Sequence, residues 1–239
     1  MKRASWILLA GLVAACTAPG RTSAPARSAA GPPHPEDPRD GDVPLPASAG
    51  WNASLVIDNG KTGIWTVGSF PIFETLGCPQ VVGLDDQGRC WVLASYSGRW
   101  TPMTIIHDRR WLGGLAHADV DPRLPGRELY TGGQRGNLFQ VGAYPQGSLD
   151  CRLIAHFPGR EIHTIVAGEL DPASPGKELL VFTRPGGLFR VTPTGADGTF
   201  RSERIADVPG RVRDALVLPA APGAVPEIAT VSRAGQLRL

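Results

Sequence analysis

One unit of about 50 residues occurs three times in this chain, at 119–141, 169–191 and 218–239. The first two copies share an acidic turn ending in Asp-Pro, a Pro-Gly pair followed by a basic residue, Glu and Leu, and a Gly-x-Leu-Phe-x-Val segment. The third copy keeps a Pro-Gly pair, the Glu and the final apolar segment in step. Self-similarity at this period is typical of propellers and solenoids, whose units cannot bury their apolar faces alone. The repeat therefore predicts a scaffold and leaves its ligand open.

Each repeat consists of short β-rich runs separated by Gly and Pro clusters. The expected strands are 115–120, 128–131, 138–142 and 151–157 in one repeat, and 164–170, 178–182, 188–192 and 202–206 in the next. A weaker earlier copy has expected strands at 81–84 and 90–93. Four short strands at intervals of about ten residues predict a four-stranded antiparallel blade, and no amphipathic helix interrupts the series. We expect an all-β fold, a β-propeller with four or five blades over residues 51–239.

The two ends of this domain predict how the ring closes. The runs 54–57 and 63–67 flank Asn59-Gly60, and Asn-Gly between β-rich runs is a strong hairpin signal. The last repeat stops at Leu239, within its third strand. Because a propeller avoids exposed edges, we expect the N-terminal hairpin to pair with 236–239 and complete the last blade. The alternative is an incomplete ring, the front part of a larger propeller.

The N-terminus has the pattern of a secretion signal. A basic start at residues 1–3 precedes an apolar run, 6–15, that is too short to span a bilayer. The segment Val-Ala-Ala-Cys at 13–16 resembles the lipobox of bacterial lipoproteins. The resemblance implies that 1–15 is a signal peptide and that Cys16 becomes the first mature residue and carries acyl chains such as palmitate. Stable anchoring needs two or more chains, and lipoproteins of this type resemble triacylated ones. The alternative is an ordinary signal peptide cut nearby.

Residues 16–50 have a composition unlike that of the repeats. Ala, Pro, Gly, Ser and Arg dominate, and large apolar side chains are almost absent, so the segment cannot bury enough surface to order itself. We expect a disordered tether between the lipid and the propeller. Thr17, rather than Asp, follows the cysteine. By resemblance to the lipoproteins of enteric bacteria, whose sorting depends on this residue, the absence of Asp implies the outer membrane. The expected location is therefore the bacterial cell envelope.

The charge of the chain bears on its partners, and the cysteine count bears on possible disulfides. The formal net charge is +2 with mixed signs and no basic stripe, which excludes nucleic acid as a partner. Cys78, Cys90 and Cys151 are an odd number of candidates for disulfides. Cys78 and Cys90 would lie at opposite ends of the expected 81–93 hairpin, a poor geometry for a bridge. We therefore expect three buried thiols.

The acidic turns resemble the FG-GAP or VCBS repeats of integrin α-chain propellers and many bacterial secreted proteins. The resemblance covers residues 80–239 and implies a β-propeller in which such turns commonly bind calcium. The candidate ligands are Asp119, Asp121, Glu128, Glu169, Asp171 and Glu178. Each turn supplies three carboxylates, whereas Ca²⁺ takes six to eight oxygens, and the third copy keeps only one acid. The residues favour acids that cap backbone amides, with no cofactor, and leave calcium as the alternative.

No catalytic motif stands out. The sequence has no Gly-x-Ser-x-Gly, no His-x-x-x-His and no phosphate-binding glycine loop. We expect a lipid-anchored binding or assembly module for a protein or glycan. A polysaccharide-active enzyme is the alternative, and it would need ionisable side chains that converge from several blades. The candidates for such convergence are Asp85, Asp119, His163 and Asp214.

Overall fold

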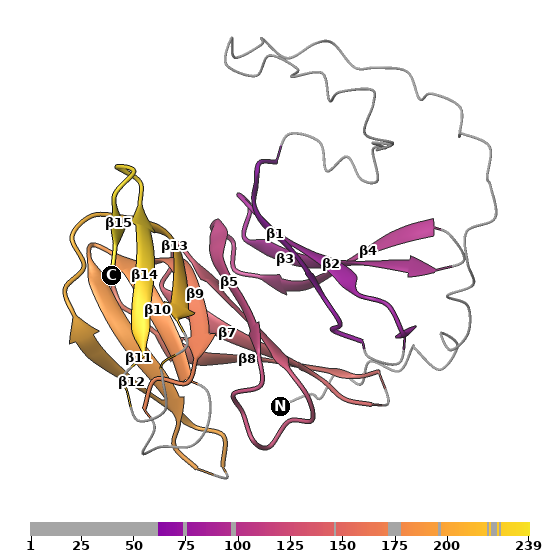
Figure 1. Cartoon of the computed structure of the whole chain (residues 1–239). Coiled ribbons are helices and arrows are strands. Elements are labelled where there is room, and N and C mark those ends of the chain that lie inside the picture. The colour runs from indigo at the N-terminus through magenta and orange to yellow at the C-terminus, as the bar shows by residue number, and fades with distance from the viewer. Residues whose placement is uncertain are drawn as a thin grey trace, which may run out of the picture. The chain divides into compact units, whose positions relative to one another are not determined.

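The computed structural model describes residues 62–239, except 74–75, 97–98, 146, 172–177, 196, 219, 221–223 and 225. The expected signal peptide, Cys16, the tether and the Asn59-Gly60 turn lie outside the described residues. The regular elements of the described part are β-strands (Figure 1). None of its segments is a helix long and apolar enough to cross a membrane.

The strands form four antiparallel sheets, each made of consecutive segments of chain (Figure 1). The first sheet contains β1 (Ile64–Phe70), β2 (Gln80–Asp85), β3 (Arg89–Tyr96) and β4 (Arg99–His107). The second contains β5 (Leu112–Ala118), β6 (Glu128–Gly133), β7 (Asn137–Ala143) and β8 (Leu149–His156). The third contains β9 (Glu161–Gly168), β10 (Glu178–Arg184), β11 (Gly187–Pro193) and β12 (Phe200–Ala206). The fourth contains β13 (Val212–Leu218), β14 (Glu227–Ser232) and β15 (Leu237–Arg238).

This arrangement confirms the all-β class and the strand order expected within each repeat. The strands expected at 115–120, 128–131, 138–142 and 151–157 correspond to β5 to β8, with bounds that differ by three residues or fewer. The glycine kept before the third strand of the repeat has a backbone role. Gly88 and Gly136 have φ of 80° and 71°. A Cβ atom there would lie 2.1 Å from the Arg110 carbonyl oxygen and 2.2 Å from that of Phe157, respectively, so glycine is required.

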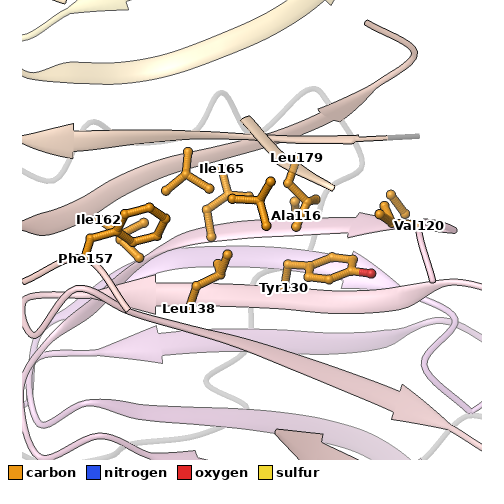
Figure 2. Packing of buried hydrophobic residues seen from close by; sticks show 11 residues of the cluster. Ala116, Val120, Tyr130, Leu138, Phe157, Ile162, Ile165 and Leu179 are labelled. Atoms are coloured by element: carbon orange, nitrogen blue, oxygen red, sulfur yellow. The ribbon is translucent and has the colours of Figure 1, made fainter. Parts of the chain in front are cut away.

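Three apolar clusters lie between successive sheets. The largest joins the second and third sheets through Tyr130, Leu138, Ile162 and Leu179, all fully buried (Figure 2). Similar clusters join the first sheet to the second and the third to the fourth. Every residue of β6 is buried, as expected where both faces of a sheet are covered by its neighbours.

The strand expected at 63–67 does not pair with 236–239, whereas 54–57, the other run of the expected closing hairpin, lies outside the described residues. The strand expected at 63–67 forms as β1, but it pairs with β2, with Val67 opposite Gly83. Within the described residues, β15 pairs with β14 alone. The connection from β1 to β2 is short, so local pairing costs less loop-closure entropy than pairing with the last strand of the chain. β1 is therefore the first strand of its own sheet.

The three cysteines are thiols, as expected, but their burial differs from the expectation. Cys78, Cys90 and Cys151 form no disulfide with one another. The expectation that all three are buried is wrong, because Cys90 alone is buried and Cys151 is exposed on β8. Cys151 lies near an edge of its sheet, where alternate residues point away from the neighbouring sheets.

Candidate functional site

The first strand of each sheet has a β-bulge at the same place. The strands lie next to one another in the pairs β1 and β5, β5 and β9, and β9 and β13. Near the start of each strand the pairing skips one residue: Trp65, Gly113, His163 or Arg213. Bulges re-aim side chains and often occur beside functional sites. The repeat therefore brings four irregular positions to the same end of its first strands.

A turn from the same sheet lies beside each bulge. The amides of Asp86, Gln134 and Arg233 donate to the carbonyl oxygens of Gly63, Trp111 and Arg211 over 3.1, 2.9 and 2.8 Å. Arg184 occupies the equivalent turn position of the third sheet and pairs with Glu161. We call the side chains at these positions the inner-strand site: Trp65, Asp86, Trp111, Gln134, Glu161, His163, Arg184, Arg211, Arg213 and Arg233.

Four of these side chains form one stack, with one member from each sheet. The guanidinium carbon of Arg211 lies 5.3 Å from the centroid of the Trp65 ring. The Trp65 ring stacks on Trp111, with centroids 5.2 Å apart, and Trp111 stacks on His163 at 4.8 Å. The indole N–H of Trp65 donates to the Asp86 carboxylate. Groups from all four sheets are thus in continuous contact at this end of the first strands.

The inner-strand site is basic on the side of the third and fourth sheets. Burial first, and then Arg213, Arg233 and Arg184, lower the pKa of the Arg211 guanidinium. Among the described residues, Glu161 is the one carboxylate paired with any of these four arginines, at 3.9 Å from Arg184. Like charges at this density are costly unless an anion joins them.

His163 sits within this charge cluster in a neutral form. Its side chain is only 5% exposed, and its Nε2 lies 3.3 Å from the Glu161 carboxylate. Burial, followed by the charges of Arg211, Arg184 and Arg213, lowers its pKa to about 4. The imidazole is therefore uncharged at neutral pH and serves as a packing surface for Trp111.

A pocket of about 580 Å³ opens between three turns on the basic side. We call it the arginine pocket, and its lining includes Arg184, Gly186, Pro209, Arg211, Ser232 and Arg233. The Nε of Arg211 is buried and has no hydrogen-bond partner among the described residues. Two further arginines hold one wall, since Arg160 donates to the Pro185 carbonyl oxygen at 2.7 Å and Arg204 to that of Gly186 at 3.4 Å. The pocket is thus lined by guanidinium groups on a supported turn.

The acidic turn of the first repeat, expected as a candidate calcium site, has a different set of partners. Asp121 is fully buried, and its carboxylate accepts hydrogen bonds from the side chains of Arg123, Arg152 and Gln140. Burial alone would raise the pKa of Asp121, but the bonds from Arg123 and Gln140 outweigh it and lower the pKa to about 2. Two guanidinium groups therefore supply the positive charge beside this carboxylate.

The glutamates of the two acidic turns cap backbone amides. Glu128 Oε2 accepts from the amides of Val120 and Asp121 at 3.0 and 3.1 Å and from the Tyr130 hydroxyl at 2.7 Å. In the second repeat, Glu178 Oε2 accepts from the Leu170 amide at 2.7 Å. The shared Glu of the repeat thus fixes the turn that leaves the first strand of its sheet.

In the second repeat, the acidic turn has other charged partners than in the first. Arg190 lies 3.9 Å from the Asp171 carboxylate and donates to Glu203 at 3.1 Å. Asp119 and Glu169, the first acid of each turn, are exposed. No group of three or more His, Cys, Asp or Glu side chains in the described part of the chain is arranged to hold a metal ion.

The other sequence candidates do not meet in one place. Asp85 is buried and accepts from Arg89 at 2.7 Å. His117, which is not one of these candidates, packs against the Phe70 ring, and burial, then Arg127, lowers its pKa to about 4. Asp214 is exposed on β13. Of the four side chains expected to converge, His163 alone belongs to the inner-strand site.

Sequence reasoning missed the arginines of this site. A signal was present in the repeat, because the residue two before the conserved turn glycine is Asp86, Gln134, Arg184 or Arg233. This position varies in charge from sheet to sheet, whereas the glycine two residues later is kept in every copy. Position-by-position comparison of the repeats would have separated it from the structural positions.

Comparisons with known proteins give no family for this chain. No protein-family model matches the sequence, including those for the repeats that its acidic turns resemble, and no curated protein matches it.

Proposed function

We propose that this protein is a lipid-anchored β-propeller of the bacterial cell envelope that acts as a binding or assembly module. The four sheets would be its blades, with β1, β5, β9 and β13 as the innermost strands. The equivalent bulges on these strands and the order in which they lie side by side support this arrangement. The contact between Arg211 of the last sheet and Trp65 of the first supports a closed ring.

The observation that carries the binding role is the arginine pocket. Arg184, Arg211 and Arg233 come from three separate segments and face a pocket of about 580 Å³, within the size range of small-ligand sites. Function concentrates on loops held by a rigid scaffold, and these turns are held by sheets with buried cores. A cluster of positive charge with so few acidic partners suits recognition of a negatively charged group.

The same geometry gives less support to the enzymatic alternative. General acid–base catalysis needs a titratable group that reaches the substrate and has a pKa near the working pH. His163 is the histidine of this site, and its side chain is 5% exposed and packed under Trp111, with a pKa of about 4. The arginines can bind and orient an anion, but they do not exchange protons at neutral pH.

The anchor and the location rest on the lipobox resemblance at 13–16. Acylated Cys16 and a tether over residues 16–50 would hold the propeller away from the outer membrane. The ligand would then be a protein or glycan of the envelope that presents negative charge.

Capture from envelope extract tests the binding role. Immobilised full-length protein should retain at least one envelope component, and the double variant Arg211→Gln/Arg233→Gln should lose it. Arg99→Gln/Arg201→Gln is the matched control, because it also removes two positive charges, from strands β4 and β12, where both arginines are exposed. Equal retention by the wild type and the double variant would contradict the proposed site.

A further inference from the structure

We infer that the arginine pocket binds a compact oxyanion that carries two or more negative charges, a phosphate group or a polycarboxylate. The inference names the ligand class of the proposed binding module and rests on that proposed function. Arg184, Arg211 and Arg233 are the recognition residues, and Arg213 adds a further positive charge nearby.

The charge count at the pocket favours a multiply charged ligand. Three guanidinium groups line it, and among the described residues Glu161 is the one carboxylate paired with any of them. Glu161 is shared with His163, which lies nearer to it than Arg184 does. A single negative charge would leave most of the repulsion in place, whereas two or more negative charges neutralise it.

The chemistry of the lining favours oxygen anions. A guanidinium presents a rigid fork of N–H groups that matches the oxygens of phosphate and carboxylate. The buried Nε–H of Arg211 has no acceptor within the described structure, and a polar group buried in this way normally finds a partner. The Nε–H is covered in this conformation, so an oxyanion in the pocket would become its acceptor once the Arg211 side chain turned toward the pocket.

The residues at the turn position of each repeat favour anion binding on the side of the third and fourth sheets. The turn position that bears Arg184 and Arg233 in the last two sheets bears Asp86 and Gln134 in the first two. The Asp86 carboxylate is held by the indole N–H of Trp65 and the amide of Gly63. The negative charge of Asp86 would repel an anionic ligand. The ligand is therefore expected between the third and fourth sheets, where the pocket lies.

The test is a calorimetric titration of the purified full chain at about 20 mM salt, where charge screening is weak. The probes are inorganic phosphate, citrate and acetate. We expect phosphate, citrate or both to bind at least about tenfold more tightly than acetate, since acetate carries one charge. Tighter phosphate binding identifies a phosphate ester as the natural group, and tighter citrate binding identifies a polycarboxylate.

Variants then locate the binding site. Arg211→Gln and Arg233→Gln should each weaken binding about tenfold or more, the typical effect of removing one charged hydrogen bond. Arg201→Gln should leave the affinity within about twofold, since it changes the net charge without touching the pocket. Arg233 is exposed on a turn, so its variant keeps the test valid if Arg211→Gln fails to fold.

Two results would overturn the inference: multivalent anions that bind no more tightly than acetate, or equal weakening by Arg233→Gln and Arg201→Gln. The outcome separates the two proposals. If the anions fail but envelope capture still depends on Arg211 and Arg233, the binding role stands and the oxyanion assignment falls. If the anions bind as expected but no envelope component is captured, the oxyanion site stands and the envelope role falls.

Discussion

The guanidinium of Arg211 lies over the ring of Trp65, with its carbon 5.3 Å from the ring centroid. Trp65 belongs to the first strand of the first sheet, and Arg211 directly precedes the first strand of the last sheet. The opposite neighbour of Trp65 in the stack is Trp111 of the second sheet. One side chain thus links three of the four sheets, and the fourth joins through His163.

Lipidation is the first prediction. Because Cys16 follows Val-Ala-Ala, the mature N-terminus should be a diacylglyceryl cysteine, detected by mass spectrometry. Cys16→Ala should move the protein from the membrane fraction to the soluble fraction, since the lipid is the proposed anchor. A soluble wild-type protein that begins at another residue would reject the anchor.

Calcium should stabilise the protein little. A ligand that binds only the native state stabilises it by RT ln(1 + [L]/Kd), about 2.7 kcal/mol at a hundredfold excess over Kd. The Asp121 carboxylate already accepts hydrogen bonds from Arg123 and Arg152, which a calcium ion would have to displace. We expect little shift in Tm on adding calcium to chelator-treated protein. A clear upward shift that Asp121→Ala abolishes would establish a calcium site.

Glu128 should be one of the largest single contributors to stability outside the apolar core. Glu128→Ala removes an acceptor shared by two buried amides and the Tyr130 hydroxyl, at a cost of about 2–4 kcal/mol. Chemical denaturation measures the change in the free energy of unfolding. The control is Glu203→Ala, which breaks an exposed pair with Arg190 and should cost less than about 1 kcal/mol. Equal losses would mean that the cap is not formed.

Two partly buried histidines, His117 and His163, should make stability depend on pH. The folded-state pKa of His117 and of His163 is about 4, below the ordinary value of 6.5. The unfolded chain therefore binds more protons between these values, and the free energy of unfolding falls as pH falls from about 6.5 to about 4. The double variant His117→Phe/His163→Phe should flatten this part of the profile, as measured by denaturation at each pH. An unchanged slope would show that neither histidine is held neutral.

The strands and turns of the fold could be predicted from the sequence because their residue patterns recur in successive copies of the repeat. Strands β5 to β12 were predicted within three residues of their bounds, since Gly and Pro separate them and apolar residues fill them. The Asp121-Pro122 and Pro125-Gly126 segments marked the turn after β5 for the same reason. Turn residues and apolar strand residues that recur in successive copies support one another as predictions.

Relations between distant parts of the chain could not be predicted in the same way. The pairing of β1 with β2 depends on loop-closure entropy and on the packing of Phe70 against the second sheet, neither of which leaves a local pattern. Arg184, Arg211 and Arg233 are far apart in sequence and meet only because bulges at equivalent positions re-aim the neighbouring backbone. One of the partners of Asp121, Arg152, likewise comes from the distant strand β8.

The central claim, that all four sheets meet at the inner-strand site, is tested most directly by a double-mutant cycle on Trp65 and Arg211. The variants are Trp65→Leu, Arg211→Met and their combination, with the free energy of unfolding measured for each. We predict a coupling energy of about 0.5–2 kcal/mol, the usual range for a cation over an indole ring. The control cycle pairs Arg211→Met with Trp100→Leu, because Trp65 and Trp100 are both 42% exposed on the first sheet. Coupling for Trp65 with additivity for Trp100 supports the claim, whereas additivity within about 0.3 kcal/mol in both cycles would contradict it.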